Sequence, residues 1–186
     1  MVREQEHKAY GFDFPPLGRR FDLLEDALQV FPLMWGPGAP AFEGKVVTVA
    51  EALCYPRPLQ ERIPILVGGS GERRTLRLVA QYADACNLFG DAATVAHKVG
   101  VLRAHCTEVG RAPSAVQVTH LSSAQVAGDP PADVPQDRTP TGTVEDHVGR
   151  YRELAEAGVQ TEIVRLATLD EESIAGFAPV VAAFGD

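Results

Sequence analysis

The chain has 186 residues, of which 45% are hydrophobic and 23% are charged, and its net charge is -8. This length predicts a single domain, residues 1–186, with a sizeable core, and the acidic balance argues against nucleic acid or an anionic membrane as a partner. Its three cysteines form no CxxC motif, which indicates reduced thiols rather than a disulfide framework. No apolar run approaches the ~20 residues of a membrane span. The polar N-terminal segment lacks a signal-peptide core, so we expect a cytoplasmic protein.

The first third of the chain predicts one amphipathic helix over 20–31, followed by a loop. The apolar residues of this helix recur every three or four positions: Phe21, Leu24, Leu28 and Phe31. Pro32 is expected to kink or end it, because proline disrupts the helical hydrogen-bond ladder. Glycines and prolines punctuate 35–40, which predicts a loop, and 42–49 is expected to form a short strand or hairpin.

From residue 63 onward, short apolar strands alternate with helical patterns. Strands are predicted at 63–67, 85–89, within 115–126 and at 161–166, and helices at 72–82, 92–109, 144–154 and 173–184. Gly110 stands where a glycine commonly ends a helix. Thr143 and Asp146 have the spacing of a capping box, and Ser173 is the expected N-cap of the last helix. The proline- and aspartate-rich segment 128–141 is interpreted as a mobile loop.

This alternation predicts an α/β fold with a parallel sheet and right-handed crossovers. A closed barrel of eight strands with their helices takes roughly 250 residues. We therefore expect a partial (β/α)8 TIM barrel with about four parallel strands and flanking helices. Such a sheet has two open edges with unpaired backbone groups.

The turn after the first predicted core strand is the strongest candidate for a binding site. Its sequence, Gly68-Gly69-Ser70-Gly71, follows a strand and precedes a helix. Glycines allow the backbone to approach a ligand closely, and the N–H groups of the following helix favour an anion. The turn matches neither the P-loop nor the GxGxxG pattern. It either cradles a phosphate or merely connects two elements.

Other polar residues at predicted strand ends have two interpretations each. Asn87 either hydrogen-bonds a ligand or ties down a loop. His120 either transfers a proton or is a hydrogen-bonded structural histidine. Arg165 either meets an anionic group or pairs with a carboxylate.

Several reaction classes lack their residues in this sequence. No lysine follows a predicted strand, which argues against a Schiff-base aldolase, and no GxSxG elbow is present. His97 and His105 share a helix but have no third ligand nearby, so we expect no metal site.

Residues 64–87 closely resemble the luciferase-like monooxygenase family, from Pro64-Ile65-Leu66-Val67-Gly68-Gly69 through to Ala85-Cys86-Asn87. The flanking segments agree with the family too: 6–11, 20–25, 42–45, 56–60, 142–146 and 158–159. The family's first four strands, which carry much of the flavin-ring pocket, have no counterpart here. The chain therefore resembles a truncated member, its C-terminal half only.

The resemblance implies an oxidoreductase that acts on a small-molecule substrate with reduced FMN or a deazaflavin coenzyme of the F-420 type. It implies that Gly68 and Gly69 contact the cofactor's phosphate-bearing tail, with Ser70, Gly71 and Asn87 beside them. No catalytic residue is assigned, and His120 is the weak candidate. The alternative is a catalytically incomplete half-barrel that binds a phosphate-bearing ligand or a partner chain. In either case we expect a homo-oligomer or pairing through the open sheet edges.

Overall fold

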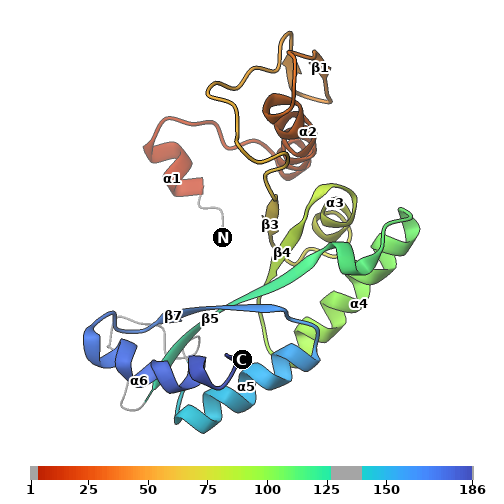
Figure 1. Cartoon of the computed structure of the whole chain (residues 1–186). Coiled ribbons are helices and arrows are strands. Elements are labelled where there is room, and N and C mark those ends of the chain that lie inside the picture. Colours follow the sequence, from red (N-terminus) through yellow and green to blue (C-terminus); the bar gives the residue numbers. More distant parts are fainter. Residues whose placement is uncertain (1–3, 127–139, 186) are drawn as a thin grey trace. The chain divides into compact units, whose positions relative to one another are not determined.

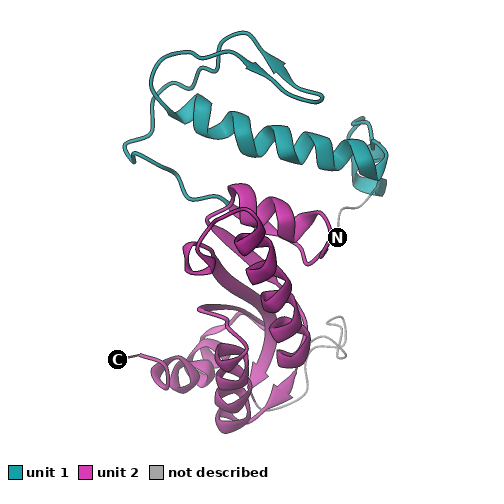
Figure 2. Cartoon of the chain, turned by 90° about the vertical axis from the view of Figure 1, so that its right-hand side faces the viewer, with its two compact units in different colours: residues 1–65 teal, residues 66–186 magenta. Residues whose placement is uncertain are grey.

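The structure is a computed structural model that describes residues 4–126 and 140–185. The chain divides into two compact units, Met1–Ile65 and Leu66–Asp186 (Figure 2). Most of the predicted loop over 128–141 lies outside the described residues. Among those described, no helix is long and apolar enough to cross a membrane.

Unit 1 contains two helices and a small hairpin. Its elements are α1 (Glu4–Ala9), α2 (Leu17–Trp35), β1 (Phe42–Glu43) and β2 (Thr48–Val49), and β1 and β2 pair antiparallel, as predicted. Pro32, which is expected to kink or end the helix, does not end it, because α2 continues through this proline to Trp35. A proline this close to the C-terminus removes one ladder hydrogen bond, and the last turn still closes through Gly36 N–H to Pro32 O at 2.9 Å.

A buried carboxylate joins α2 to the hairpin of unit 1. The Asp26 side chain has no exposed surface. Its oxygens accept backbone N–H bonds from Lys45 at 3.0 Å, Val46 at 2.7 Å and Val47 at 2.9 Å. A Cβ added at Gly44 would lie within 2.5 Å of both oxygens. Burial raises the pKa of Asp26, but the three N–H bonds outweigh it and hold the pKa below its usual value.

Unit 2 is a parallel βα structure (Figure 1). Its strands are β3 (Leu66–Gly68), β4 (Ala85–Leu88), β5 (Gln117–Val126), β6 (Thr141–Gly142) and β7 (Thr161–Leu166), and its helices are α3 (Thr75–Tyr82), α4 (Ala92–Glu108), the 3-10 turn η1 (Pro113–Ala115), α5 (Val144–Glu156) and α6 (Glu171–Ala182). The strand order is β3-β4-β5-β7, and the short β6 pairs with the end of β5. The predicted parallel sheet is confirmed.

The helix-capping residues are those predicted from the sequence, with one exception. Thr143 and Asp146 form the predicted capping box at the start of α5, and Gly110 has φ +71° after α4, in the left-handed region that glycine adopts without strain. The predicted N-cap Ser173 is wrong. Asp170 caps α6 instead, and its carboxylate accepts the Ser173 N–H at 2.8 Å.

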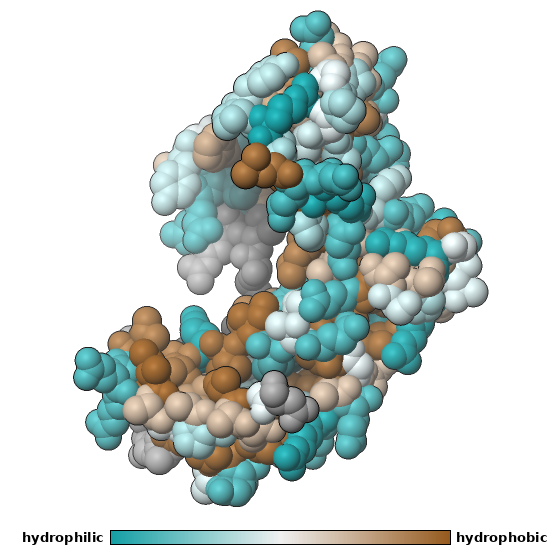
Figure 3. Space-filling model, viewed as in Figure 1, coloured by the Kyte–Doolittle hydropathy of each residue, from teal (hydrophilic) through white to brown (hydrophobic). Residues whose placement is uncertain are grey.

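All four helices of unit 2 lie on one side of its sheet (Figures 1 and 2). The strand residues that point to this side are buried, among them Val67, Cys86, Leu88, Val118 and Ala124. Alternate residues point the opposite way, and there Leu66 is 50% exposed, Leu121 38% and Ile163 44%. We call this side, formed by alternate residues of β3, β4, β5 and β7, the helix-free face. Hydrophobic side chains are visible over this part of unit 2 in Figure 3.

The three cysteines are free, as the sequence predicts, and two of them are inaccessible. Cys86 and Cys106 have no exposed surface, whereas Cys54 is half-buried. Burial raises the pKa of Cys86 to about 11, so its reactive thiolate is scarce at pH 8. We expect an aromatic disulfide reagent to titrate one thiol in the native chain and three thiols after the chain has been unfolded in urea. Rapid native labelling of Cys86 or Cys106 would contradict this packing.

Candidate functional site

The C-terminal ends of β3 and β4 bring together the glycine turn and Asn87. Gly69 N–H donates to the Asn87 carbonyl oxygen at 3.2 Å, and Gly68 pairs in register with Asn87. Ligands of parallel α/β folds bind beyond this end of the strands. The predicted turn and the predicted asparagine are therefore neighbours at the binding edge of the sheet.

The turn has a shape that glycine makes possible. Gly69 has φ +126°, which side-chain-bearing residues rarely adopt. A Cβ at Gly71 would lie 2.8 Å from Thr75 Oγ1, whereas a Cβ at Gly68 would meet nothing within 4 Å. The backbone therefore packs tightly against the start of α3 and leaves space on the side of Gly68. Ser70 is half-buried between these glycines.

Glu72 anchors the turn to α4. Its carboxylate forms an ion pair with Lys98 and lies 3.0 Å from His97 Nε2, and its carbonyl oxygen lies 2.8 Å from His105 Nε2. Hydrogen bonds from Lys98 and His97 lower the pKa of Glu72. The acidic side chain nearest to the glycines is thus neutralised by α4, while Arg73 is exposed at the entrance of α3. His97 and His105, for which the sequence predicts no metal site, both contact Glu72.

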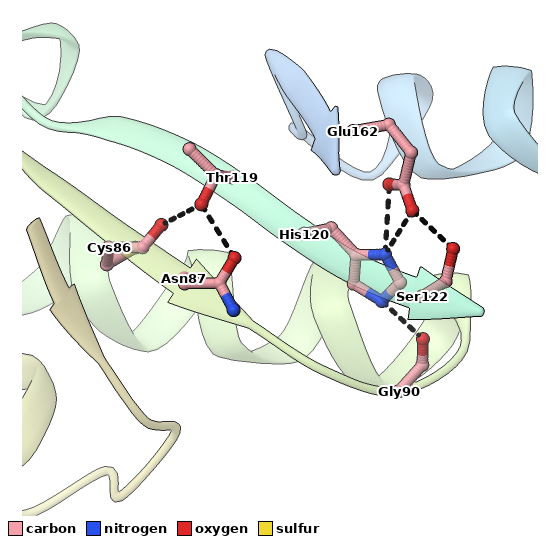
Figure 4. A network of polar contacts seen from close by, with 7 residues as sticks. All are labelled: Cys86, Asn87, Gly90, Thr119, His120, Ser122 and Glu162. Carbon is pink, nitrogen blue, oxygen red and sulfur yellow. Dashed lines mark hydrogen bonds and ion pairs between the residues drawn. The ribbon is translucent and has the colours of Figure 1, made fainter. Parts of the chain in front are cut away.

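Asn87 lies on the helix-free face and is fixed by its neighbour on β5 (Figure 4). Thr119 Oγ1 lies 2.8 Å from Asn87 Oδ1 and 3.2 Å from the Cys86 carbonyl oxygen, so its hydroxyl donates toward these acceptors. Asn87 is 8% exposed and Thr119 is 4% exposed. Because the amide oxygen faces Thr119, the Asn87 NH2 group is directed elsewhere, and no described residue accepts from it. It is a donor next to the turn.

His120 lies on the opposite side of the sheet, facing the helices (Figure 4). It is 3% exposed. Its Nδ1 lies 2.9 and 3.0 Å from the two carboxylate oxygens of Glu162, and its Nε2 lies 2.9 Å from the Gly90 carbonyl oxygen. Both nitrogens face acceptors, so both carry protons and the ring is an imidazolium.

The ion pair overcomes the burial of His120. Burial lowers the pKa of this histidine, but the hydrogen bond and the charge of Glu162 together raise the pKa above its ordinary value. Ser122 Oγ donates to Glu162 Oε1 at 2.6 Å and completes the network. The structure therefore brings His120 together with Glu162 and Ser122, and separates it from the glycine turn.

Sequence reasoning missed Glu162. Its one signal is that it is the acidic residue within the alternating pattern of 161–166. Its partnership with His120 follows from the register between β5 and β7, which the sequence does not give.

His147 shows the opposite protonation state. It has no exposed surface. Its Nε2 donates to the Gln125 carbonyl oxygen at 3.0 Å, and its Nδ1 accepts from Arg150 at 3.1 Å. Burial lowers the pKa of His147, so the ring is neutral at pH 7 and stabilises the end of β5.

A parallel βα sheet whose carboxyl edge carries a glycine turn and a polar amide is typical of α/β proteins of the barrel class. The profile of the luciferase-like monooxygenase family matches residues 2–134, and the chain belongs to this family. The sheet corresponds to part of the TIM barrel of its structural neighbours.

Among curated relatives, an F420-dependent glucose-6-phosphate dehydrogenase of Microbacterium testaceum is 31% identical over 74 residues. That match covers 40% of this chain and 21% of the relative. Among solved structures, an F420-dependent secondary alcohol dehydrogenase with an F420–acetone adduct has a TM-score of 0.81 at 18% identity. A riboflavin lyase with modified FMN has a TM-score of 0.76 at 14% identity. These alignments include 97% and 96% of this chain, but they cover 66% and 61% of the two solved structures.

Proposed function

We propose that Gly68–Gly71 and Asn87 hold the phosphate-bearing part of a flavin-type cofactor, F420 or FMN, in an oxidoreductase of this family. The observation that carries the proposal is the turn itself. Its backbone needs a positive φ at Gly69 and has no room for a side chain at Gly71, and it leads into the N–H end of α3. Such an end stabilises a phosphate by its partial positive charge.

The residues around the turn fit this group. The Asn87 amide offers a donor beside Gly68, and the acidic Glu72 is paired with Lys98 and His97. The cofactor, when bound, supplies hydride or oxygen chemistry. The residues of this chain bind and orient its phosphate end. The choice of cofactor is supported by the two F420-dependent enzymes and by the structure with modified FMN that resemble this chain.

A comparison of FMN with riboflavin tests this proposal, because the two ligands differ by the phosphate. We expect FMN or F420 to bind the wild-type chain, and riboflavin to bind at least tenfold more weakly than FMN. In Gly69→Ala, the unfavourable φ of +126° disturbs the turn. FMN affinity should therefore fall about tenfold, or about 1.4 kcal/mol, while riboflavin affinity stays within twofold. Titration followed by flavin or deazaflavin fluorescence measures each affinity.

Gly110→Ala is the matched control. Gly110 also has a positive φ, and a Cβ there would meet nothing within 4 Å, but it lies after α4, away from the turn. Both ligands should bind this variant as they bind wild type. Absence of FMN and F420 binding at high micromolar concentration would refute the cofactor assignment. Equal affinities for FMN and riboflavin would refute the role of the turn.

A further inference from the structure

We infer that Arg165 on β7 forms a second anion-binding position, which takes the carboxylate or phosphate group of a substrate. In register, Arg165 lies opposite Ser123 and two residues beyond Ile163, which lies opposite Leu121. Since side chains alternate along a strand, Arg165 points to the helix-free face, like the exposed Ile163 and Leu121. Its side chain is itself exposed.

The charge distribution on this face is unusual for an acidic chain. The face is formed by every second residue of the four strands, from Leu66 in β3, Ala85 in β4, Gln117 in β5 and Thr161 in β7. This set contains no aspartate or glutamate, although the chain has a net charge of -8. Arg165 is its one charged member.

Among the described residues, Arg165 has no carboxylate partner, which was one of the two interpretations that the sequence left open. It forms no ion pair or hydrogen bond with any residue in the described part of the chain. By contrast, Arg111 donates to the carbonyl oxygens of Ala83 and Ala115, and Arg57 to those of Gly36 and Gly38. A guanidinium on a largely apolar surface retains its planar set of donors for a carboxylate or phosphate. Ser123, directly opposite, adds a hydroxyl.

This position differs from the glycine turn. The register runs from Gly68 through Asn87 and Thr119 to Thr161, and Arg165 lies four residues further along β7. At ordinary strand spacings, Arg165 is roughly 14 Å across the sheet and roughly 13 Å along it from Gly68. One phosphate cannot contact both. Assignment of the Arg165 anion to the substrate rests on the proposed function, which places the cofactor phosphate at the turn.

Inorganic phosphate and acetate are the probes for this site, titrated into the 15N-labelled full chain at constant ionic strength set with sodium chloride. NMR follows the Arg165 Nε–H and the Ser123 amide at one position, and the amides of Gly68–Gly71 at the other. We expect a saturable shift at Arg165 and Ser123 with at least one probe. Arg165→Met should reduce the Ser123 shift at least tenfold and Arg165→Lys at least threefold, because lysine lacks the bidentate fork. Arg152→Met, which removes an exposed charge from α5, should leave the shift unchanged.

The same titrations, repeated at saturating FMN, distinguish an anion of the cofactor from an anion of the substrate. The turn amides should then cease to respond to phosphate, and Arg165 should respond as before. The inference is overturned if neither probe produces a saturable shift at Arg165, or if Arg165→Met leaves the Ser123 response intact. Loss of the Arg165 response with FMN would overturn the substrate assignment. A response at Arg165 with none at the turn would instead refute the proposed phosphate site and leave the second anion site standing.

Discussion

Glu162→Gln is expected to lower the free energy of unfolding of unit 2 by about 2–4 kcal/mol at pH 6, as removal of one partner from a buried ion pair does. The carboxylate is the acceptor for His120 Nδ1 and for Ser122. Glutamine keeps the volume but loses the charge, and its NH2 group faces donors. The buried histidine then has no anion, and its burial favours the neutral ring.

The stability that Glu162→Gln removes should decrease as the pH rises. The pKa of His120 is raised in the folded state, so the ion pair contributes fully below the unfolded value of about 6.5. Its contribution disappears as the pH rises through the folded pKa. We therefore expect wild-type unit 2 to lose stability as the pH rises above about 6.5 and through the raised folded pKa, and the difference in stability between wild type and Glu162→Gln to narrow as it does so.

Thiol labelling during urea unfolding isolates unit 2, because Cys86 and Cys106 are buried in its core. Glu153→Gln is the control, since Glu153 is an exposed residue of α5. This variant should unfold within about 0.5 kcal/mol of wild type. An equal effect of the two glutamine substitutions, or an effect of Glu162→Gln that grows as the pH rises above about 6.5, would refute the imidazolium assignment.

Asp26→Asn is expected to lower the free energy of unfolding of unit 1 by about 2–3 kcal/mol, because one of the three N–H donors on this buried side chain then faces an amide NH2 group. The two Asp26 oxygens now accept from Lys45, Val46 and Val47. An asparagine has one acceptor oxygen and cannot serve all three. The single tryptophan, Trp35, lies in α2 of the same unit, so its fluorescence during urea unfolding reports the loss.

The Asp26 contribution should vanish in acid. The pKa of this carboxyl is lowered in the folded state, so its stabilisation is present above the unfolded value of about 3.9 and is lost as the pH falls through the folded pKa. The gap between wild type and Asp26→Asn should therefore shrink below pH 4. Glu43→Gln removes an exposed charge from the hairpin. It should change neither the Trp35 urea transition nor its dependence on pH. A Trp35 transition that is identical in Asp26→Asn would contradict the structural role of Asp26.

Local signals in the sequence were enough to predict the βα order of unit 2. The strand 161–166 was predicted with its observed bounds, because β-branched residues, flanking glycine and helix caps all act over a few residues. The glycine turn and its neighbour Asn87 could be predicted for the same reason. Their role as a phosphate site remains a prediction.

The sequence could not give features that depend on distant pairing. Asp26 is separated by about twenty residues from the N–H groups it accepts, and the pattern around it is that of an ordinary helix surface. The face on which His120 lies depends on strand register, since a shift of one residue would move it to the helix-free face. The division into two units follows from contacts across the whole chain.

The ten-residue strand β5 pairs with β4, β6 and β7. Strands β3 and β4 are connected to β6 and β7 through β5, and among the described residues no other strand pairing joins these two parts of the sheet. A break in β5 would therefore remove the hydrogen bonds to its neighbours on both sides. Unit 2 should consequently tolerate insertions at its helix–strand loops far better than any break in this strand, which makes β5 the poorest place to divide the protein into fragments.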